Sequence, residues 1–336
     1  EWELRLRDRN IETVSDDDWA WADLVLLSGM LVQKYDMHAA IAEARRHGKP
    51  TVCGGPYATA LPDELWQAGA DYLVLDEGEI TIPLWLDDLA RGAPRGIYRS
   101  DGEKPDVTTT PIPRFDLLDF SAYSEMAVQY SRGCPFRCEF CDIIVLYGRR
   151  PRTKTPEQLL AELQRLYDLG WRRSVFVVDD NFNGNKANAK QMLRALQPWM
   201  AERGFPFNFS TEASLDLARD LELLDLMVDC NFGAVFLGIE TPDEASLVAS
   251  NKKQNTKESL DDAVSTIAGS GLRIMAGFII GFDGERPGAG QRIVDFVERN
   301  NIPLTTFSTV SYTHLRAHET IHAISYAVFC LKKGGG

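Results

Sequence analysis

Three cysteines lie within eight residues of this chain, in the stretch YSRGCPFRCEFCDI, and they restrict the fold more than any other feature. Cys134, Cys138 and Cys141 have the spacing C-x3-C-x2-C, with no histidine beside them. Thiolates are soft ligands that suit zinc and iron–sulfur clusters. A structural zinc site and a ferredoxin-type cluster each take four protein ligands, yet the only other cysteine between residues 126 and 310 is Cys230. Three cysteines on a [4Fe–4S] cluster leave one iron free for a chelating substrate.

Strand-like and helix-like segments alternate on both sides of this loop and predict six β/α units. The strands are expected at about residues 126–131, 173–179, 206–211, 234–239, 273–281 and 303–309. The first helix after the loop should begin with Thr155 as its N-cap, Pro156 at the first helical position and Gln158 completing a capping box. The pattern predicts a parallel barrel, complete or open, with its chemistry at the C-terminal ends of the strands.

Residues 1–91 predict a separate, Rossmann-like α/β domain. The apolar runs ADLVLLSG and DYLVLDEGE, with KPTVCGGP between them, suit buried parallel strands. The chain opens on a strand-like alternation, so we expect the first strand of this domain and the true N-terminus to be missing. Residues 92–125 contain four prolines and are interpreted as a linker. The fold class is therefore α/β, an incomplete Rossmann-like domain followed by a partial (β/α)6 barrel over residues 126–310.

Charge and hydropathy exclude several classes of protein. The net charge of −13 disfavours nucleic-acid binding, which needs clustered Lys and Arg. The sequence has no apolar run of about eighteen residues and no basic-then-apolar N-terminal signal, so neither a transmembrane segment nor secretion is predicted. The cysteines form no disulfide framework, because three are crowded and Cys53, Cys230 and Cys330 are scattered. A reducing cytoplasm is the predicted location.

The loop CPFRCEFC, directly after the first strand of a β/α series, resembles the signature loop of the radical S-adenosylmethionine (radical SAM) superfamily. The resemblance implies that Cys134, Cys138 and Cys141 hold a [4Fe–4S] cluster whose open iron is chelated by SAM. It also implies that one electron, from a flavodoxin- or ferredoxin-type donor, cleaves SAM to methionine and a 5′-deoxyadenosyl radical. Phe140 matches the family position that packs near the adenine.

Other SAM-binding positions follow the resemblance strand by strand. VFVVDDNF ends the second strand where the family binds the SAM amino group, and only one of Asp179 and Asp180 should point inward, because adjacent strand residues face opposite sides. A solvated strand end or a helix cap is the alternative for that pair. FSTEASL and LGIETP place Glu212 and Glu240 at the ends of the third and fourth strands, where each is either a site residue or half of a salt bridge.

The stretch GFIIGF resembles the fifth-strand motif of the family, whose backbone meets the adenine. The matching positions are Gly277, Ile279 and Gly281. The acidic residue that usually ends this motif falls on Gly284, with Glu285 one position late. That departure leaves the last contact of the motif open.

The N-terminal stretches LLSGML, CGGP and EGE resemble the cobalamin-binding domain that precedes many radical SAM barrels. Ser28, Gly54 and Gly55 match the residues that line a slot for the nucleotide tail of the cofactor, where glycines allow a close approach. The usual first motif, D-x-H-x-x-G, is absent. DMHAAI imitates it at Asp36 and His38 but lies inside a predicted helix, so His38 is interpreted as a helix-face residue and not as a cobalt ligand.

Taken together, these motifs resemble one cobalamin-domain radical SAM group that includes the hopanoid C-2 methylases, over roughly residues 1–310. The resemblance implies methyl transfer from methylcobalamin to an unreactive carbon of a lipid or other small molecule. Two alternatives remain. One is a radical SAM methylthiotransferase that acts on RNA, whose extra cluster needs three more cysteines where only Cys53 is present. The other is a non-catalytic iron–sulfur protein.

The C-terminal residues 311–336 contain a formal zinc-protease motif, H-E-x-x-H, from His318 to His322. The match to the family ends at Val310, and SYTHLRAHET resembles translated sequencing-adapter sequence. We therefore interpret this tail as non-native, predict no zinc site there, and expect it to lie outside the fold.

Overall fold

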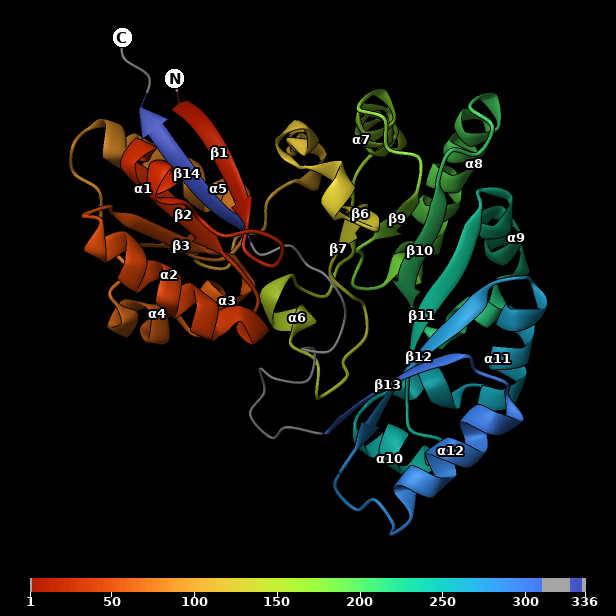
Figure 1. Cartoon of the computed structure of the whole chain (residues 1–336). Coiled ribbons are helices and arrows are strands. Elements are labelled where there is room, and N and C mark those ends of the chain that lie inside the picture. Colours follow the sequence, from red (N-terminus) through yellow and green to blue (C-terminus); the bar gives the residue numbers. More distant parts are fainter. Residues whose placement is uncertain (1, 310–326, 334–336) are drawn as a thin grey trace. The chain divides into compact units, whose positions relative to one another are not determined.

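The computed structural model describes residues 2–309 and the strand 327–333. The chain divides into two compact units between Asp106 and Val107 (Figure 1). The segment 92–125, expected to be a linker, is shared between them. Its strand β5 (Ile97–Tyr98) pairs with the sheet of unit 1, whereas the 3₁₀ turn η2 (Val107–Thr109) belongs to unit 2.

Unit 1 is built on one six-stranded sheet with the order β1-β14-β2-β3-β4-β5. The strands β2 to β5 pair in parallel, as predicted. The strands are β1 (Trp2–Asp8), β2 (Leu24–Ser28), β3 (Thr51–Gly54), β4 (Tyr72–Val74), β5 and β14 (Ala327–Lys333). The helices are α1 (Asp16–Trp21), α2 (Lys34–Arg46), α3 (Gly55–Ala60), α4 (Pro62–Ala68) and α5 (Gly78–Ala90).

The strand β14 departs from the expected organisation. It falls in the segment expected to lie outside the fold, but it pairs antiparallel with β1 on one side and with β2 on the other. The formal H-E-x-x-H motif of that segment, from His318 to His322, where no zinc site was predicted, lies outside the described residues.

Residues that are neighbours along the parallel strands of unit 1 pack into two separate apolar cores. Val25 and Leu73 pack in one core with residues of α2, while Leu24, Val74 and Trp85 pack in the other. Successive side chains point to opposite faces of a sheet, so both faces are covered. This double burial explains why the strand sequences are apolar runs without alternation.

Unit 2 is an open sheet of six parallel strands in the order β6-β9-β10-β11-β12-β13. The strands are β6 (Glu125–Val128), β9 (Ser174–Val177), β10 (Asn208–Ala213), β11 (Phe232–Glu240), β12 (Arg273–Ile280) and β13 (Leu304–Thr309). The helices are α6 (Ile143–Leu146), α7 (Pro156–Asp168), α8 (Lys186–Glu202), α9 (Leu221–Asp229), α10 (Glu244–Ala249), α11 (Leu260–Gly269) and α12 (Ala289–Arg299). Within the described residues the edge strands β6 and β13 do not pair with each other, so the partial barrel stays open.

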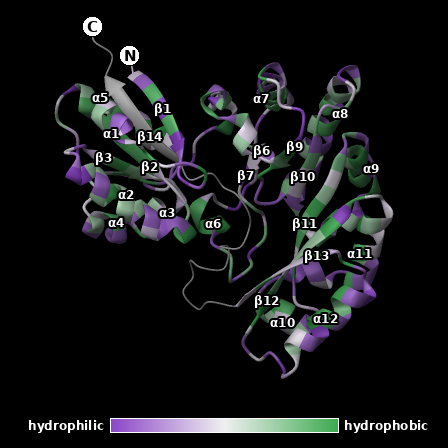
Figure 2. Cartoon of the chain, in the orientation of Figure 1, coloured by the Kyte–Doolittle hydropathy of each residue, from purple (hydrophilic) through white to green (hydrophobic). Residues whose placement is uncertain are grey.

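The predicted start of α7 is confirmed. The Thr155 side chain accepts a hydrogen bond from the Gln158 backbone N–H, and the Gln158 side chain accepts one from the Thr155 N–H. The apolar face of this helix is buried in the large core of unit 2, which also takes residues from five of the six parallel strands. Figure 2 shows hydrophobic residues along strand β11, whereas helix α12 carries both hydrophobic and hydrophilic residues. No helix of the described chain is long and apolar enough to cross a membrane.

Candidate functional site

The cysteine loop follows β6 and is closed by its own short hairpin. Strand β7 (Ser131–Arg132) pairs antiparallel with β8 (Arg152–Thr153), so the chain leaves and returns at one place. The Cys134 backbone N–H donates to the Gly148 carbonyl at 3.2 Å. Gly133 has φ +92, and a Cβ there would stand 2.8 Å from the Gly148 oxygen, so glycine is needed at this close approach.

All three thiols of the loop are reduced and largely withdrawn from water. Cys138 is buried, and Cys134 and Cys141 are half-buried. Burial raises the pKa of the Cys134 and Cys141 thiols, whereas backbone N–H groups nearby oppose that rise. Within residues 2–309 no group of three or more His, Cys, Asp and Glu side chains is arranged around a single metal position.

Each thiol has a nitrogen donor close to it, which fits thiolates that bear negative charge on a cluster. The backbone N–H of Phe136 acts on Cys134 and that of Ile143 acts on Cys141. The Asn181 side-chain N–H₂ lies 3.6 Å from the Cys134 sulfur, and the Gln254 N–H₂ lies 3.4 Å from the Cys138 sulfur. Hydrogen bonds to cysteine sulfurs are a normal feature of iron–sulfur sites. The donor set therefore fits the predicted cluster.

The two aspartates after β9 both turn toward the chain that leads into the cysteine loop. Asp179 is fully buried and accepts from the backbone N–H groups of Tyr130 and Ser131, at 2.7 and 2.9 Å, and from the Ser131 hydroxyl at 2.6 Å. Asp180 accepts from the Gly133 N–H at 2.7 Å. Burial raises the pKa of Asp179 to about 6 and that of Asp180 to about 7.

The prediction that only one of these aspartates points toward the site stays a prediction, because their hydrogen bonds go to residues 130–133 and not to a ligand. Strand β9 ends at Val177, so the alternation of a strand no longer applies at Asp179 and Asp180. Asp179 is occupied by three hydrogen bonds that hold the backbone. Asp180 is half-buried and accepts one, which leaves it more capacity for a ligand.

The two glutamates at the strand ends differ in their partners. Glu240 ends β11 with φ +67, and its Oε1 forms an ion pair with the Lys252 Nζ at 2.6 Å. Glu212, near the end of β10, is half-buried and makes no hydrogen bond or ion pair within the described chain. Burial raises the pKa of Glu212 to about 8, and the carboxylates of Asp180 and Asp179 add to the rise. The salt-bridge alternative thus applies to Glu240 but not to Glu212.

The fifth-strand motif is shaped by packing as well as by its match to the family. A Cβ at Gly277 would stand 2.7 Å from the Phe236 ring, so this glycine makes room for an aromatic side chain. Ile279 is buried. Gly281 has φ +98, and its N–H donates to the Glu285 carboxylate at 2.7 Å. Glu285 stands one position after the place where the family has its acidic residue, and its carboxylate still contacts the end of the motif.

The segment after α10 contacts the cysteine loop, and the sequence patterns did not single it out. The Glu139 N–H donates to the Ser250 carbonyl at 3.0 Å, and the Asn251 side chain donates to the Glu139 carboxylate at 2.6 Å. The Lys252 ammonium lies 5.6 Å from the centre of the Phe140 ring. The Phe140 ring also meets Phe282 edge to face, with 5.9 Å between the ring centres. The one signal in the sequence was the polar run NKKQN.

The residues predicted for cobalamin come together in unit 1. Ser28 and Gly54 are register partners at the ends of β2 and β3. Gly55 has φ +85, and a Cβ there would stand 2.5 Å from the Ser28 hydroxyl oxygen. The ends of β2 and β3 are therefore packed closely against each other. His38 lies in α2 and is hydrogen bonded to the Tyr57 hydroxyl at 2.8 Å.

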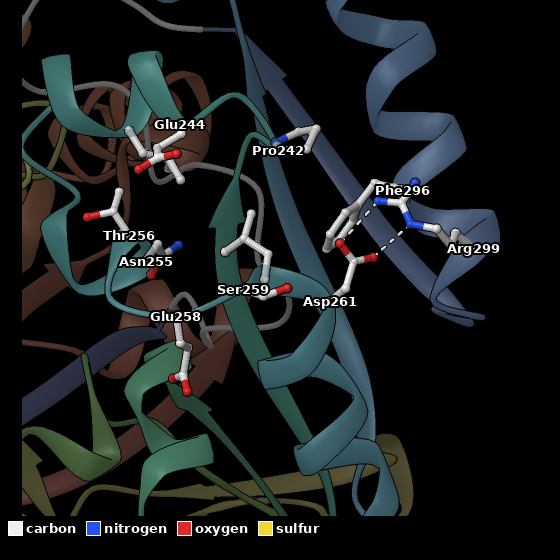
Figure 3. Close-up of a pocket in the computed structure, with 11 residues that line it drawn as sticks. Pro242, Glu244, Asn255, Thr256, Glu258, Ser259, Asp261, Phe296 and Arg299 are labelled. Carbon is white, nitrogen blue, oxygen red and sulfur yellow. Dashed lines mark hydrogen bonds and ion pairs between the residues drawn. The ribbon is translucent and has the colours of Figure 1, made fainter.

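A cavity of about 360 Å³ opens beside α11 and α12, away from the predicted residues. Figure 3 shows Asp261 and Arg299 at its edge, joined by an ion pair of 2.8 Å. None of the predicted SAM or cluster residues lines it. Asn255 connects it to the strand ends, because its side chain donates to the carbonyls of Gly238 and Ile239 at 3.0 and 3.1 Å.

Unit 2 thus defines a class of fold, a parallel β/α sheet with a three-cysteine loop and acidic side chains at the C-terminal strand ends. The family model of the radical SAM superfamily matches residues 128–297. The chain belongs to the radical SAM superfamily.

Curated relatives extend the match beyond unit 2. An uncharacterized methyltransferase of Synechocystis sp. is 63% identical over 308 residues, which are 92% of this chain and 57% of that protein. The hopanoid C-2 methylase of Rhodopseudomonas palustris is 39% identical over 312 residues, 92% of this chain and 59% of that protein. The chain therefore spans less than two thirds of the length of these two relatives.

Solved structures with the same fold include two radical SAM enzymes with a cobalamin bound. TsrM of Kitasatospora setae, with cobalamin and a [4Fe–4S] cluster bound, has a TM-score of 0.67 and 19% identity, over 82% of this chain and 58% of that chain. OxsB, with aqua-cobalamin and SAM bound, has a TM-score of 0.65 and 19% identity, over 86% of this chain and 45% of that chain. At this identity the likeness shows the fold.

Proposed function

We propose that this chain is the catalytic part of a cobalamin-dependent radical SAM methyltransferase. Cys134, Cys138 and Cys141 would hold a [4Fe–4S] cluster with one iron open for SAM. The observation that carries the proposal is the loop itself, in which each of the three thiols has a nitrogen donor beside it. When bound, such a cluster supplies the electron that cleaves SAM to methionine and a 5′-deoxyadenosyl radical.

The side chains around the loop would bind and orient SAM. Glu212 has no hydrogen-bond or ion-pair partner in the described chain, and with Asp180 it would offer acceptors for the amino group of SAM. Phe140 presents an aromatic ring between the second and third cysteines for the adenine. Glu240 remains a candidate for the sugar hydroxyls, although Lys252 already neutralises its charge.

Cobalamin would bind at the strand ends of unit 1. Ser28, Gly54 and Gly55 meet there, and neither glycine has room for a Cβ. The cobalamin-bound structures of TsrM and OxsB, which share the fold, support this assignment. Methylcobalamin would supply the methyl group for an unreactive carbon.

The hopanoid C-2 methylase among the relatives supports a lipid or other small molecule as the substrate. A flavodoxin- or ferredoxin-type protein would supply the electron. A reducing cytoplasm suits the five cysteines of residues 2–309, all of which are free.

The test is anaerobic reconstitution with iron and sulfide, followed by SAM and dithionite. We expect 5′-deoxyadenosine from the wild type and none from Cys134→Ala. Cys230→Ala is the matched control, because Cys230 is a buried cysteine of the same unit that donates to the Leu193 carbonyl, outside the loop. Absence of 5′-deoxyadenosine from a fully loaded wild type would contradict the proposal and favour a non-catalytic iron–sulfur protein.

Titration with methylcobalamin then distinguishes the proposed methyltransferase from the methylthiotransferase alternative. Stoichiometric binding that Gly55→Ala weakens would support the methyltransferase. Cleavage of SAM without any cobalamin binding would contradict cobalamin-dependent methyl transfer and favour the methylthiotransferase alternative.

A further inference from the structure

The three thiols of the loop do not receive their hydrogen bonds in the same way. Cys134 and Cys141 have backbone N–H groups of their own loop beside them, from Phe136 and Ile143. For Cys138, the hydrogen bond in the described chain comes from the side chain of Gln254, 116 residues further along. Cys138 is also the thiol that is buried, at 7% exposure.

Gln254 is held in place by the structure around it. It lies in the 3₁₀ turn η7 (Lys253–Thr256) and is 5% exposed. The residues before it are fastened to the cysteine loop, because the Ser250 carbonyl and the Asn251 side chain both bond Glu139. The next residue, Asn255, is fastened to the end of β11 through two carbonyls. The amide of Gln254 is therefore directed at Cys138 by contacts on both sides.

An N–H donor next to a cysteine sulfur acts on the redox equilibrium of a cluster. The reduced cluster carries one more negative charge than the oxidised cluster, so a hydrogen bond to its sulfur stabilises the reduced form more. Backbone donors of the loop cannot be removed without changing its path. The Gln254 amide is a side chain and can be removed alone.

We propose that Gln254 is a positioning residue that donates an N–H···S hydrogen bond to Cys138 and thereby raises the reduction potential of the cluster. This inference rests on the proposed function, since it needs a cluster on the loop. It adds that the segment after β11 controls how easily the cluster accepts its electron.

The test compares Gln254→Met with the wild type after reconstitution. Methionine has nearly the same length and no N–H donor. Iron and sulfide content is measured first, and the midpoint potential is then measured by redox titration followed by electron paramagnetic resonance, without SAM. We expect the reduction equilibrium constant to fall about tenfold, which is about 59 mV for a one-electron couple. Gln291→Met, which removes an exposed amide bonded to Asp295 on α12, should leave the potential unchanged.

The outcomes separate this inference from the proposed function. If the wild type takes up no cluster, the proposed function fails. If the wild type and Gln254→Met both load and have the same potential, only the role of Gln254 is overturned. If Gln254→Met does not load, Gln254→Leu takes its place, because it has neither an N–H donor nor a charge. A lower potential in Gln254→Leu supports the inference, an unchanged potential overturns it, and failure of both variants to load overturns it in favour of a role in assembly.

Discussion

Glu212 is a carboxyl group near a strand end of unit 2 and has no partner in the described chain. Its substitution tests how this burial affects the stability of the fold. Burial raises the pKa of Glu212 from 4.5 to about 8, with Asp180 and Asp179 adding to the rise. In the unfolded chain this carboxyl ionises at its ordinary pKa, so between these two values the folded state binds a proton that the unfolded state releases. The contribution of Glu212 to stability is therefore fully present below about pH 4.5 and is lost as the pH rises to about 8.

The magnitude follows from the pKa difference. A rise from 4.5 to about 8 corresponds to about 5 kcal/mol, at about 1.4 kcal/mol for each pH unit. Glu212 is half-buried, and screening by solvent reduces this to about 2 kcal/mol. Glu212→Gln keeps the shape and cannot ionise. It should match the wild type near pH ~4.5 and exceed it in free energy of unfolding by about 2 kcal/mol near pH ~8.5.

Urea unfolding at several pH values between these limits measures the effect. Glu222→Gln is the control, because Glu222 is exposed on α9 and the hydrogen bond from Lys190 lowers its pKa. Its contribution has the opposite sign, present above its unfolded pKa and lost as the pH falls, so Glu222→Gln should give no gain at high pH. A stability gain in Glu212→Gln that does not change with pH would refute the reasoning.

Three further substitutions test packing, charge pairing and capping. Gly55→Ala places a Cβ against the Ser28 hydroxyl at a positive φ and should lower the free energy of unfolding by about 1–3 kcal/mol; unchanged denaturant midpoints would contradict the close approach. Lys252→Met leaves the Glu240 carboxylate buried without its cation and should lower the free energy of unfolding by about 3–5 kcal/mol. The double variant with Glu240→Gln should lose less free energy of unfolding than Lys252→Met alone. Hydrogen exchange in β11 should therefore be faster in the single variant than in the double variant. Thr155→Ala should cost about 1 kcal/mol by thermal or urea unfolding, while Thr155→Ser should retain most of the cap.

The elements of unit 2 could be predicted because their signals are local. The capping box at Thr155 and Gln158 and the apolar strand runs each depend on residues close in sequence. The parallel order of the strands then places the residues at their C-terminal ends along one edge of the sheet. For this reason the positions of Asp180, Glu212 and Glu240 near strand ends could be predicted from local patterns, whereas their assignment to SAM came from the family resemblance.

The parts that escaped prediction depend on distant pairings. Gln254 meets Cys138 across 116 residues, and Lys252 becomes the partner of Glu240 only when the chain after α10 turns back. Both are polar residues in a polar run, which normally indicates a solvated loop. Strand β14 escaped for a similar reason, because its pairing with β1 joins the two ends of the chain.

The three acidic residues at the ends of β9 and β10 show how a single edge gives similar side chains different roles. All three are withdrawn from water, and burial is the largest cause of each raised pKa. Asp179 accepts three hydrogen bonds, Asp180 accepts one, and Glu212 accepts none within the described chain. Each donor stabilises the ionised form and so opposes the rise that burial causes, at Asp179 most and at Glu212 not at all. The chain thus uses Asp179 to hold the backbone before the cysteine loop, and it leaves the buried Glu212 carboxyl without a hydrogen-bond donor in the described chain.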